Sequence, residues 1–312
     1  MNAIELWPHA EAQRCSAGAL TNGLAGPAGF QRCVVCDEAL QPGPAADRWR
    51  CPACGYQAST FAAAASAAAV ELDDLQRRRG LAGLRRRGAR AILGLLGQHR
   101  SLPDSTLCDV GCGYGWLLDE AERLGVRALG IEPDQPVAAQ AIARGRQVRC
   151  GRFPDCLAPG ERFDLVTLCD VFEHLPEPRR MLAAIRQHLA AEGLLAITLP
   201  TSDGALFRAA TLLDRCGVRG PLDRLWQRGY PSPHLHYFQA RNLARLATRA
   251  GFELLASRSL PAWQLRGLWS RLRMDPGRPA WKSAACWLAL AAGAPASACL
   301  PSDILLHVYR AA

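Results

Sequence analysis

Lysine is nearly absent from this sequence. Lys282 is the only lysine among 37 basic residues, and the other 36 are arginine. A GC-rich genome produces such a bias without selection for any ligand, so runs of arginine are weaker evidence of binding here than usual. The distribution of charge is harder to attribute to base composition. Segments 59–100 and 204–312 carry net charges of +5 and +10, whereas segment 101–203 carries −5.

Targeting and membrane-spanning patterns are also missing. No stretch combines a charged start, a short apolar block and a cleavage site, as a secretory signal would. One uncharged run, Ser283 to Leu300, is interrupted by Gly293 and Pro295, and it predicts a buried or interfacial helix rather than a membrane span. We therefore expect a cytoplasmic protein. Peripheral membrane contact stays open, because the C-terminal region is rich in tryptophan, at Trp263, Trp269, Trp281 and Trp287.

Cysteine, by contrast, is abundant, with 13 residues in 312. Eight of them are scattered singly through a chain that is otherwise expected to be intracellular, which favours reduced thiols over a secreted disulfide framework. Four others form two close pairs in "CVVC" and "CPACG", fourteen residues apart. That spacing predicts a zinc ribbon, with the thiolate ligands Cys33, Cys36, Cys51 and Cys54.

The surroundings of the cysteine pairs agree with a structural metal site. Gly55 allows the chain to turn away behind the second pair, and Trp49 and Tyr56 supply a small core. A redox pair and an iron site are the alternatives. Zinc is favoured because neither pair lies in a thioredoxin-like βαβ unit and because structural zinc ribbons are common. Four thiolates leave no open position for a catalytic water, so we expect this module to be remote from the chemistry.

Short apolar runs alternate with helical stretches in the middle of the chain. They are "LCDV", "RALGIE", "VRCG", "FDLVTLCD" and "LLAITLP", followed later by "FELLASRSL" and "DILLHVYR". Near-continuous apolar strands separated by helices are typical of a parallel sheet that is covered on both faces. The sequence therefore predicts an α/β fold with a doubly wound, Rossmann-like sheet.

A glycine-rich turn follows the first of these strands. In "DVGCGYGW" an aspartate, Asp109, precedes the alternating glycines Gly111, Gly113 and Gly115. The dinucleotide fingerprint would be G-x-G-x-x-G, with a pyrophosphate at the helix N-terminus. Here the aspartate repels an anion and favours a ligand that carries an amino group. Glu132 ends the next strand in "LGIEPD", where it can accept hydrogen bonds from both hydroxyls of a ribose.

These motifs resemble those of the class I S-adenosylmethionine-dependent methyltransferases, over residues 104–258 and again over 303–312. Within that superfamily, "FDLVTLCDVFEHLPEP" and "PHLHYFQARNLARLATRAGFELL" resemble segments of the ubiquinone- and menaquinone-type branch, which methylates small molecules. The resemblance implies a seven-stranded methyltransferase sheet and S-adenosylmethionine as cofactor. It implies that the cofactor lies against Asp109, Gly111, Cys112, Gly113, Gly115, Glu132, Pro133, Phe153, Asp170 and Val171.

One departure from the family pattern concerns the adenine. Many relatives carry an acid after the third strand that binds the adenine amino group, whereas this chain has "CGRFPD" there. We therefore expect backbone groups and packing on Phe153 to hold the adenine. The segments predicted from all these motifs are a flexible tail at 1–30, the zinc-ribbon-like module at 31–58, a helical linker at 59–100, and a methyltransferase domain at 101–312 with insertions at about 204–233 and 262–302.

Three histidines are candidate bases for a hydroxyl acceptor. His234 and His236 alternate across "PHLHYF", so an extended segment points both toward one face. His174 follows the predicted fourth strand, at the sheet edge where open α/β folds bind ligands. Each histidine also has a structural alternative. His234 and His236 can form hydrogen bonds with loop carbonyls, and His174 can orient the loop before the next helix.

Three functions compete. The first is methylation, mainly O-methylation, of a small or amphiphilic, anionic acceptor such as a sugar nucleotide, a glycan, a quinone-like or a lipid-linked molecule. The charge of +10 on segment 204–312 favours it, because arginines suit phosphate or carboxylate. The second is RNA methylation, with RNA as a less favoured partner held by the ribbon and the arginine-rich helix. The third is a non-enzymatic partner-binding module with a vestigial methyltransferase domain, which the intact glycines and Glu132 disfavour.

Overall fold

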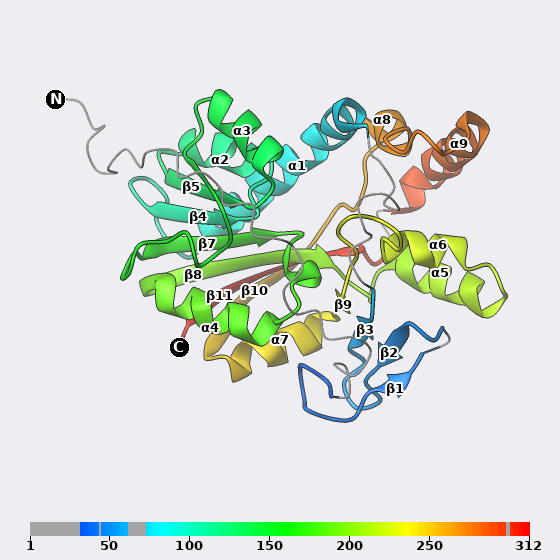
Figure 1. Ribbon diagram of the computed structural model, residues 1–312, viewed down its shortest axis with the longest axis horizontal. Coiled ribbons are helices and arrows are strands. Elements are labelled where there is room, and N and C mark those ends of the chain that lie inside the picture. The colour runs from blue at the N-terminus through cyan, green and yellow to red at the C-terminus, as the bar shows by residue number, and fades with distance from the viewer. Residues whose placement is uncertain (1–31, 44, 62–72, 298–299) are drawn as a thin grey trace.

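The computed structural model describes residues 32–43, 45–61, 73–297 and 300–312, so the flexible tail predicted at 1–30 lies outside the described residues. Seven strands form one sheet in the order β10-β11-β8-β7-β4-β5-β6 (Figure 1). Six of them run parallel, and β11 is inserted antiparallel between β8 and β10. The strands are β4 (Thr106–Val110), β5 (Arg127–Glu132), β6 (Val148–Cys150), β7 (Phe163–Cys169), β8 (Leu189–Pro200), β10 (Phe252–Leu260) and β11 (Ile304–Ala311). The predicted α/β class and doubly wound sheet are confirmed.

Helices cover both faces of this sheet, and each face has its own apolar core. One core joins the sheet to Ile92 and Leu93 of α1 and to Leu118 of α2, and the other joins it to Leu182 of α4 and Leu243 of α7. Apolar residues on both faces of the strands explain why their sequences are almost continuously hydrophobic. The covering helices are α1 (Asp74–Leu96), α2 (Trp116–Glu122) and α3 (Gln135–Ala143) on one face, and α4 (Pro178–His188) and α7 (Ala240–Arg249) on the other (Figure 1).

A second, four-stranded sheet has the order β1-β2-β3-β9. Three of its strands come from the cysteine-rich segment, and the fourth comes from the "PHLHYF" segment some 180 residues later. Its strands are β1 (Gln41–Pro42), β2 (Arg48–Arg50), β3 (Gln57–Ser59) and β9 (His236–Tyr237). The cysteine-rich segment is therefore joined to the large domain by strand pairing.

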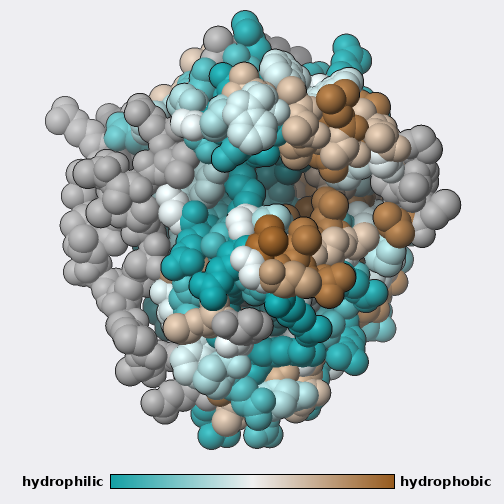
Figure 2. All heavy atoms as spheres, turned by 90° about the vertical axis from the view of Figure 1, so that its right-hand side faces the viewer, coloured by the Kyte–Doolittle hydropathy of each residue, from teal (hydrophilic) through white to brown (hydrophobic). Residues whose placement is uncertain are grey.

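The two predicted insertions are helical. Residues after β8 form α5 (Ala205–Arg215) and α6 (Gly220–Leu225), and residues after β10 form α8 (Leu268–Leu272) and α9 (Ala280–Ser297). The uncharged run that predicted a buried or interfacial helix is indeed helical in α9, but its described side chains are mostly exposed or half-buried. Among the described residues, no helix has the length and apolarity that crossing a membrane requires. Figure 2 shows this side of the molecule, where hydrophobic side chains gather among hydrophilic ones.

Candidate functional site

The order of the strands reverses at the centre of the sheet. The chain runs outward from β4 through β5 to β6, and it then returns to form β7 on the other side of β4. Ligands of open α/β sheets bind at such a switch point, beyond the carboxyl ends of the strands. Three carboxylates lie at these strand ends: Asp109 in β4, Glu132 at the end of β5, and Asp170 directly after β7.

The glycine turn that follows β4 needs its glycines for conformation. Gly111, Gly113 and Gly115 have φ values of 72°, 54° and 75°, in the left-handed region that other residues rarely adopt. A Cβ atom at Gly111 would lie 2.5 Å from Cγ2 of Val171, so the segment that follows β7 packs tightly against the start of the turn. A Cβ at Gly113 would meet no atom within 4 Å. Gly113 therefore faces open space, which is the approach a bound ligand needs.

Asp109 is buried at the carboxyl end of β4, with 2% of its surface exposed. Its Oδ1 accepts a hydrogen bond of 2.6 Å from the Thr167 hydroxyl on β7. The pKa of Asp109 is raised to about 7, mainly by burial and also by the charge of Glu132, while the Thr167 hydrogen bond and Arg85 oppose the shift. A buried carboxylate beside a second carboxylate favours a positively charged ligand group.

Glu132 is held by two backbone amides. Gly113 N–H donates to Oε2 at 2.8 Å, and Asp134 N–H donates to Oε1 at 2.9 Å. Burial raises the pKa of Glu132, while the two amides favour its ionised form. The carboxylate thus has a fixed orientation at the end of β5, next to the glycine turn, as the sequence predicts for a ribose-binding acid.

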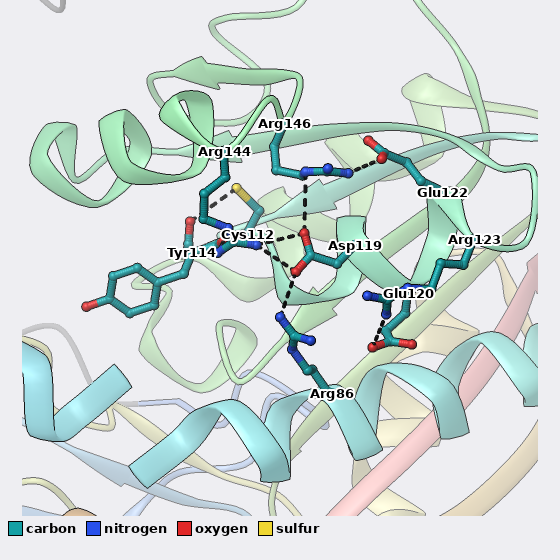
Figure 3. A network of polar contacts seen from close by, with 10 residues as sticks. Arg86, Cys112, Tyr114, Asp119, Glu120, Glu122, Arg123, Arg144 and Arg146 are labelled. Atoms are coloured by element: carbon teal, nitrogen blue, oxygen red, sulfur yellow. Dashed lines mark hydrogen bonds and ion pairs between the residues drawn. The ribbon is translucent and has the colours of Figure 1, made fainter. Parts of the chain in front are cut away.

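The helix after the turn is fixed by arginines from two other helices (Figure 3). Asp119 in the first turn of α2 accepts hydrogen bonds from Arg144, at 2.6 and 2.7 Å, and from Arg86 of α1, at 3.2 Å. Arg144 also donates to the backbone carbonyl of Tyr114 at 2.7 Å. Acidic residues stabilise a helix N-terminus, and here the same carboxylate ties the glycine turn to its neighbours.

The predicted floor of the site, Asp170 and Val171, follows β7 directly. Asp170 has a left-handed backbone (φ 54°), and its side chain forms an ion pair with Arg85 of α1. No sequence motif assigned Arg85 to the site. The only sequence signal was its place in a run of arginines, "LRRRG", in which the neighbouring Arg86 reaches Asp119. Helix α1 thus covers the cofactor end of the sheet with charged side chains.

Phe153 and Pro133, which were expected near the cofactor, have different surroundings. The Phe153 ring is buried, with its edge against His188 of α4 at a centroid distance of 5.5 Å. Pro133 is exposed directly after Glu132. Cys112 is buried, and its Sγ lies close to Gly130 of β5 rather than toward the open side of the turn.

A carboxylate and two imidazoles gather beyond β7. Ligand atoms of Glu173, His174 and His234 lie within 4.8 Å of one another. Glu173 Oε1 is 3.8 Å from Nε2 of His174 and 3.9 Å from Nε2 of His234. The Glu173 side chain is 1% exposed, and among the described residues neither of its oxygens has a hydrogen-bond partner. Burial raises the pKa of Glu173 well above its ordinary value and lowers the pKa of both histidines.

Glu173 was not among the residues predicted from the sequence, although it directly precedes His174 in "FEHLPEP". The tautomer of His174 follows from its partners. Its Nδ1 lies 2.9 Å from the Pro233 carbonyl, which only accepts, so Nδ1 carries the proton and Nε2 keeps its lone pair toward Glu173. This group of side chains can therefore take up or donate a proton, and its donor atoms also suit a divalent cation.

His236 has different partners from His234, contrary to the expectation that both face one pocket. Its Nε2 lies 2.7 Å from the Leu175 carbonyl, and its Nδ1 pairs with the hydroxyl of Tyr56. The ring is fully buried, and burial lowers its pKa to about 4. Since the carbonyl requires Nε2–H, the Nδ1 lone pair accepts from Tyr56, and no nitrogen of a neutral ring is left to take a substrate proton. The geometry of His236 fits the structural alternative.

The four cysteines of the predicted ribbon converge. Their sulfur atoms lie within 4.8 Å of one another, with 3.5 Å between Cys33 and Cys54 and 3.4 Å between Cys36 and Cys51. Tetrahedral zinc with Zn–S bonds of about 2.3 Å requires S–S separations of about 3.8 Å, so the cluster is close to the right size. The Val35 and Cys54 amides donate to Cys33 and Cys51 sulfurs at 3.4 and 3.5 Å, which favours thiolates. The module is not remote from the predicted bases, because β3 pairs with β9 and Tyr56 contacts His236.

Comparisons with known proteins agree with this geometry. A family model described as "Methyltransferase domain" matches residues 76–257, more than half of the chain. Ubiquinone biosynthesis O-methyltransferases from Nitrosococcus oceani and a Methylobacterium species are 33% and 34% identical to this chain, over 104 and 113 residues respectively. The matches cover 30% and 34% of this chain, and only 43% and 41% of the length of those relatives.

Solved structures share the fold at low identity. A SAM-dependent methyltransferase from Thermotoga maritima, described as a possible histamine N-methyltransferase, has a TM-score of 0.50 at 17% identity and covers 77% of this chain and 95% of its own. A protein from Galdieria sulphuraria, provisionally assigned as a sarcosine dimethylglycine methyltransferase, has a TM-score of 0.52 at 16% identity, with coverages of 77% and 90%. From the extent of the family match, the chain belongs to the methyltransferase domain family.

Proposed function

We propose that this protein transfers the methyl group of S-adenosylmethionine to a small or amphiphilic acceptor. One observation carries the proposal: the glycine turn is open at Gly113 and lies between the buried carboxylates of Asp109 and Glu132. Asp109 suits the ammonium group of the methionine portion, and Glu132 suits the ribose hydroxyls. When bound, the cofactor supplies an electrophilic methyl group for in-line displacement.

The chain's own contribution is binding, orientation and proton transfer. Val171 packs over Gly111, and Arg85 fixes Asp170, so the floor of the site is rigid. For a hydroxyl acceptor, the proton goes to Nε2 of His174, whose lone pair faces the buried Glu173 carboxyl. His234 lies against His174, at a ring-centroid distance of 4.7 Å, and completes this acid–base group. His236 has a structural role in the proposal.

An anionic acceptor is supported by charge. The pKa of Arg271 is lowered to about 10, first by burial and then by the charges of Arg85 and Arg224, while Asp170 opposes the shift. A buried arginine whose charged form is disfavoured by neighbouring positive charges favours a phosphate or carboxylate nearby. The RNA alternative has less support, because Arg78, Arg85 and Arg86 of the arginine-rich helix already contact Gln140, Asp170 and Asp119.

Zinc belongs to the proposal as a structural ion. Cys33, Cys36, Cys51 and Cys54 would hold it, and four thiolate ligands give it no catalytic position. A peripheral membrane contact is supported by the face that carries α8 and α9, where Trp269, Trp281 and Leu288 are 47%, 68% and 62% exposed (Figure 2). Sedimentation with phosphatidylglycerol vesicles tests it: the doubly substituted Trp281→Ser, Leu288→Ser protein is expected to bind less than the wild type, and equal binding contradicts the contact.

Calorimetry with S-adenosylhomocysteine tests the cofactor assignment. Glu132→Ala is expected to weaken binding, because it removes the ribose acceptor and leaves the Gly113 amide without its partner. Glu120→Gln is a matched control: Glu120 is also buried and acidic, but it pairs with Arg123 on α2. Undiminished binding by Glu132→Ala would refute the assignment.

A further inference from the structure

The last strand of the cysteine module holds the backbone that carries two of the histidines. In the β3–β9 pair, Ala58 is opposite His236. Beyond the pair, Ser59 N–H donates to the Leu235 carbonyl at 2.9 Å, and the Ser59 hydroxyl donates to the His234 carbonyl at 2.7 Å. The cysteine module therefore fixes the course of residues 234–236 directly.

Two hydrogen bonds continue from this strip to the acid–base group. Leu235 N–H donates to the Glu173 carbonyl at 2.9 Å. His236 Nε2–H donates to the Leu175 carbonyl at 2.7 Å. These two carbonyls flank His174, so the short helix η2 (Phe172–His174) is held from the module side. The Leu175 carbonyl requires the proton on Nε2 of His236, and the Tyr56 hydroxyl supports this tautomer by donating to Nδ1.

The cysteine turns themselves are anchored on helices of the large domain. Arg179 of α4 and Arg249 of α7 donate to the carbonyls of Val34 and Val35, at 2.5 and 2.7 Å. Both arginines also pair with Asp37 at 2.7 Å. The second cysteine turn is held by Asn242 of α7, which donates to the Cys54 carbonyl at 3.2 Å. The module thus bridges α4 and α7 to the 234–236 strip.

We infer that the cysteine module is a metal-dependent brace of the acid–base group, and that Tyr56 is its positioning residue. The role of this acid–base group in binding and deprotonating the acceptor rests on the proposed function. Small ribbons of this kind owe their folding to the metal, because four thiolates at one point replace a large apolar core. Loss of the ion releases β3, and β9 then loses its strand partner together with the hydrogen bonds that lead to Glu173 and Leu175.

Hydrogen exchange of the full chain, followed by mass spectrometry, tests the brace. Tyr56→Phe removes one hydroxyl and keeps the ring packing against Phe238. We expect exchange in peptides covering 172–176 and 234–238 to rise on the order of tenfold, because the His236 Nδ1 loses its donor while buried. Tyr309→Phe is the matched control, since the Tyr309 hydroxyl also pairs with a buried histidine nitrogen, Nδ1 of His307, at 2.7 Å on β11. It should leave those peptides unchanged.

Two further measurements separate the brace from general destabilisation. The side-chain ¹⁵N spectrum should show His236 with the proton on Nε2 in the wild type, and a shifted Nδ1 resonance in Tyr56→Phe. Chelation of metal from the wild-type protein should raise exchange in the same two peptides, so the brace is tested even if Tyr56→Phe folds poorly. Affinity for S-adenosylhomocysteine should change by less than about twofold in both cases, because no hydrogen bond or ion pair joins the glycine turn to the module among the described residues.

The outcomes are distinguishable. Unchanged exchange at 172–176 and 234–238, in both Tyr56→Phe and the chelated protein, overturns the brace. Equal effects of Tyr56→Phe and Tyr309→Phe on these peptides also overturn it. A folded, purified protein without metal contradicts both the zinc of the proposed function and the metal dependence of the brace, and the tyrosine variants then decide only the positioning role of Tyr56. Absence of cofactor binding contradicts the proposed function, and the exchange result stands independently of it.

Discussion

Alanine at Gly111 and at Gly113 should separate the stability of the glycine turn from its ligand binding. Both positions have a positive φ, so each substitution costs about 1–2 kcal/mol for the left-handed backbone. Only at Gly111 does the new Cβ meet a neighbour, Cγ2 of Val171 at 2.5 Å, and overpacking of this kind adds about 1–3 kcal/mol. Gly111→Ala should therefore be the less stable variant by about 1–3 kcal/mol.

The affinity for the cofactor should show the opposite order, with Gly113→Ala binding less tightly than Gly111→Ala. The Cβ at Gly113 meets nothing within 4 Å, so it extends into the space where the ligand is expected to lie. Urea unfolding measures the first effect, and calorimetry with S-adenosylhomocysteine measures the second. Gly113→Ala is expected to lose only the backbone cost of about 1–2 kcal/mol in stability. It is expected to lose about tenfold or more in affinity, which corresponds to about 1.4 kcal/mol per tenfold. If Gly113→Ala binds as the wild type does, the glycine turn does not contact the ligand, and the reasoning fails.

Three other predictions concern charge, metal and chemistry. Because burial raises the pKa of Asp109 from 3.8 to about 7, its contribution to stability is present below pH 3.8 and is lost as pH rises through 7. A bound ammonium group stabilises the ionised carboxylate of Asp109, so affinity for S-adenosylhomocysteine should rise between pH 6 and 8. Asp109→Asn should abolish this pH dependence. The same pH dependence of affinity in the variant contradicts a contact between Asp109 and the ligand. Elemental analysis should find about one zinc per chain, absent after Cys51→Ser and Cys54→Ser, and a folded, reduced, metal-free wild type contradicts the site. Once an acceptor is identified, His174→Gln should lower kcat about 10²-fold or more while its affinity for the cofactor stays unchanged. If the His174→Gln variant keeps the wild-type kcat across pH 6–9, His174 is not the base.

Local patterns in the sequence predicted much of this molecule. The strands β4, β5, β7 and β8 lie where continuous apolar runs placed them, because a strand covered on both faces needs apolar residues at every position. The spacing of Asp109, the glycines and Glu132 placed these residues at the ends of two neighbouring strands, since one turn and the next strand end determine it. The cysteine pairs converge as their spacing predicts.

Contacts between distant segments decided the rest. Tyr56 and His236 are 180 residues apart, and no local pattern distinguishes a histidine that will be held by a buried tyrosine from one that is free to act as a base. Arg85 reaches Asp170, and the Glu173 carboxyl is buried beside two imidazoles, only because α1 and the 234–236 strip fold over the end of β7. Backbone conformation and hydrophobic periodicity are properties of neighbouring residues, so the sequence by itself determined the sheet, the turn and the cysteine spacing. Burial, hydrogen-bond partners and pKa depend on what packs against a side chain, so only the tertiary structure decided which histidines are held and where the module docks.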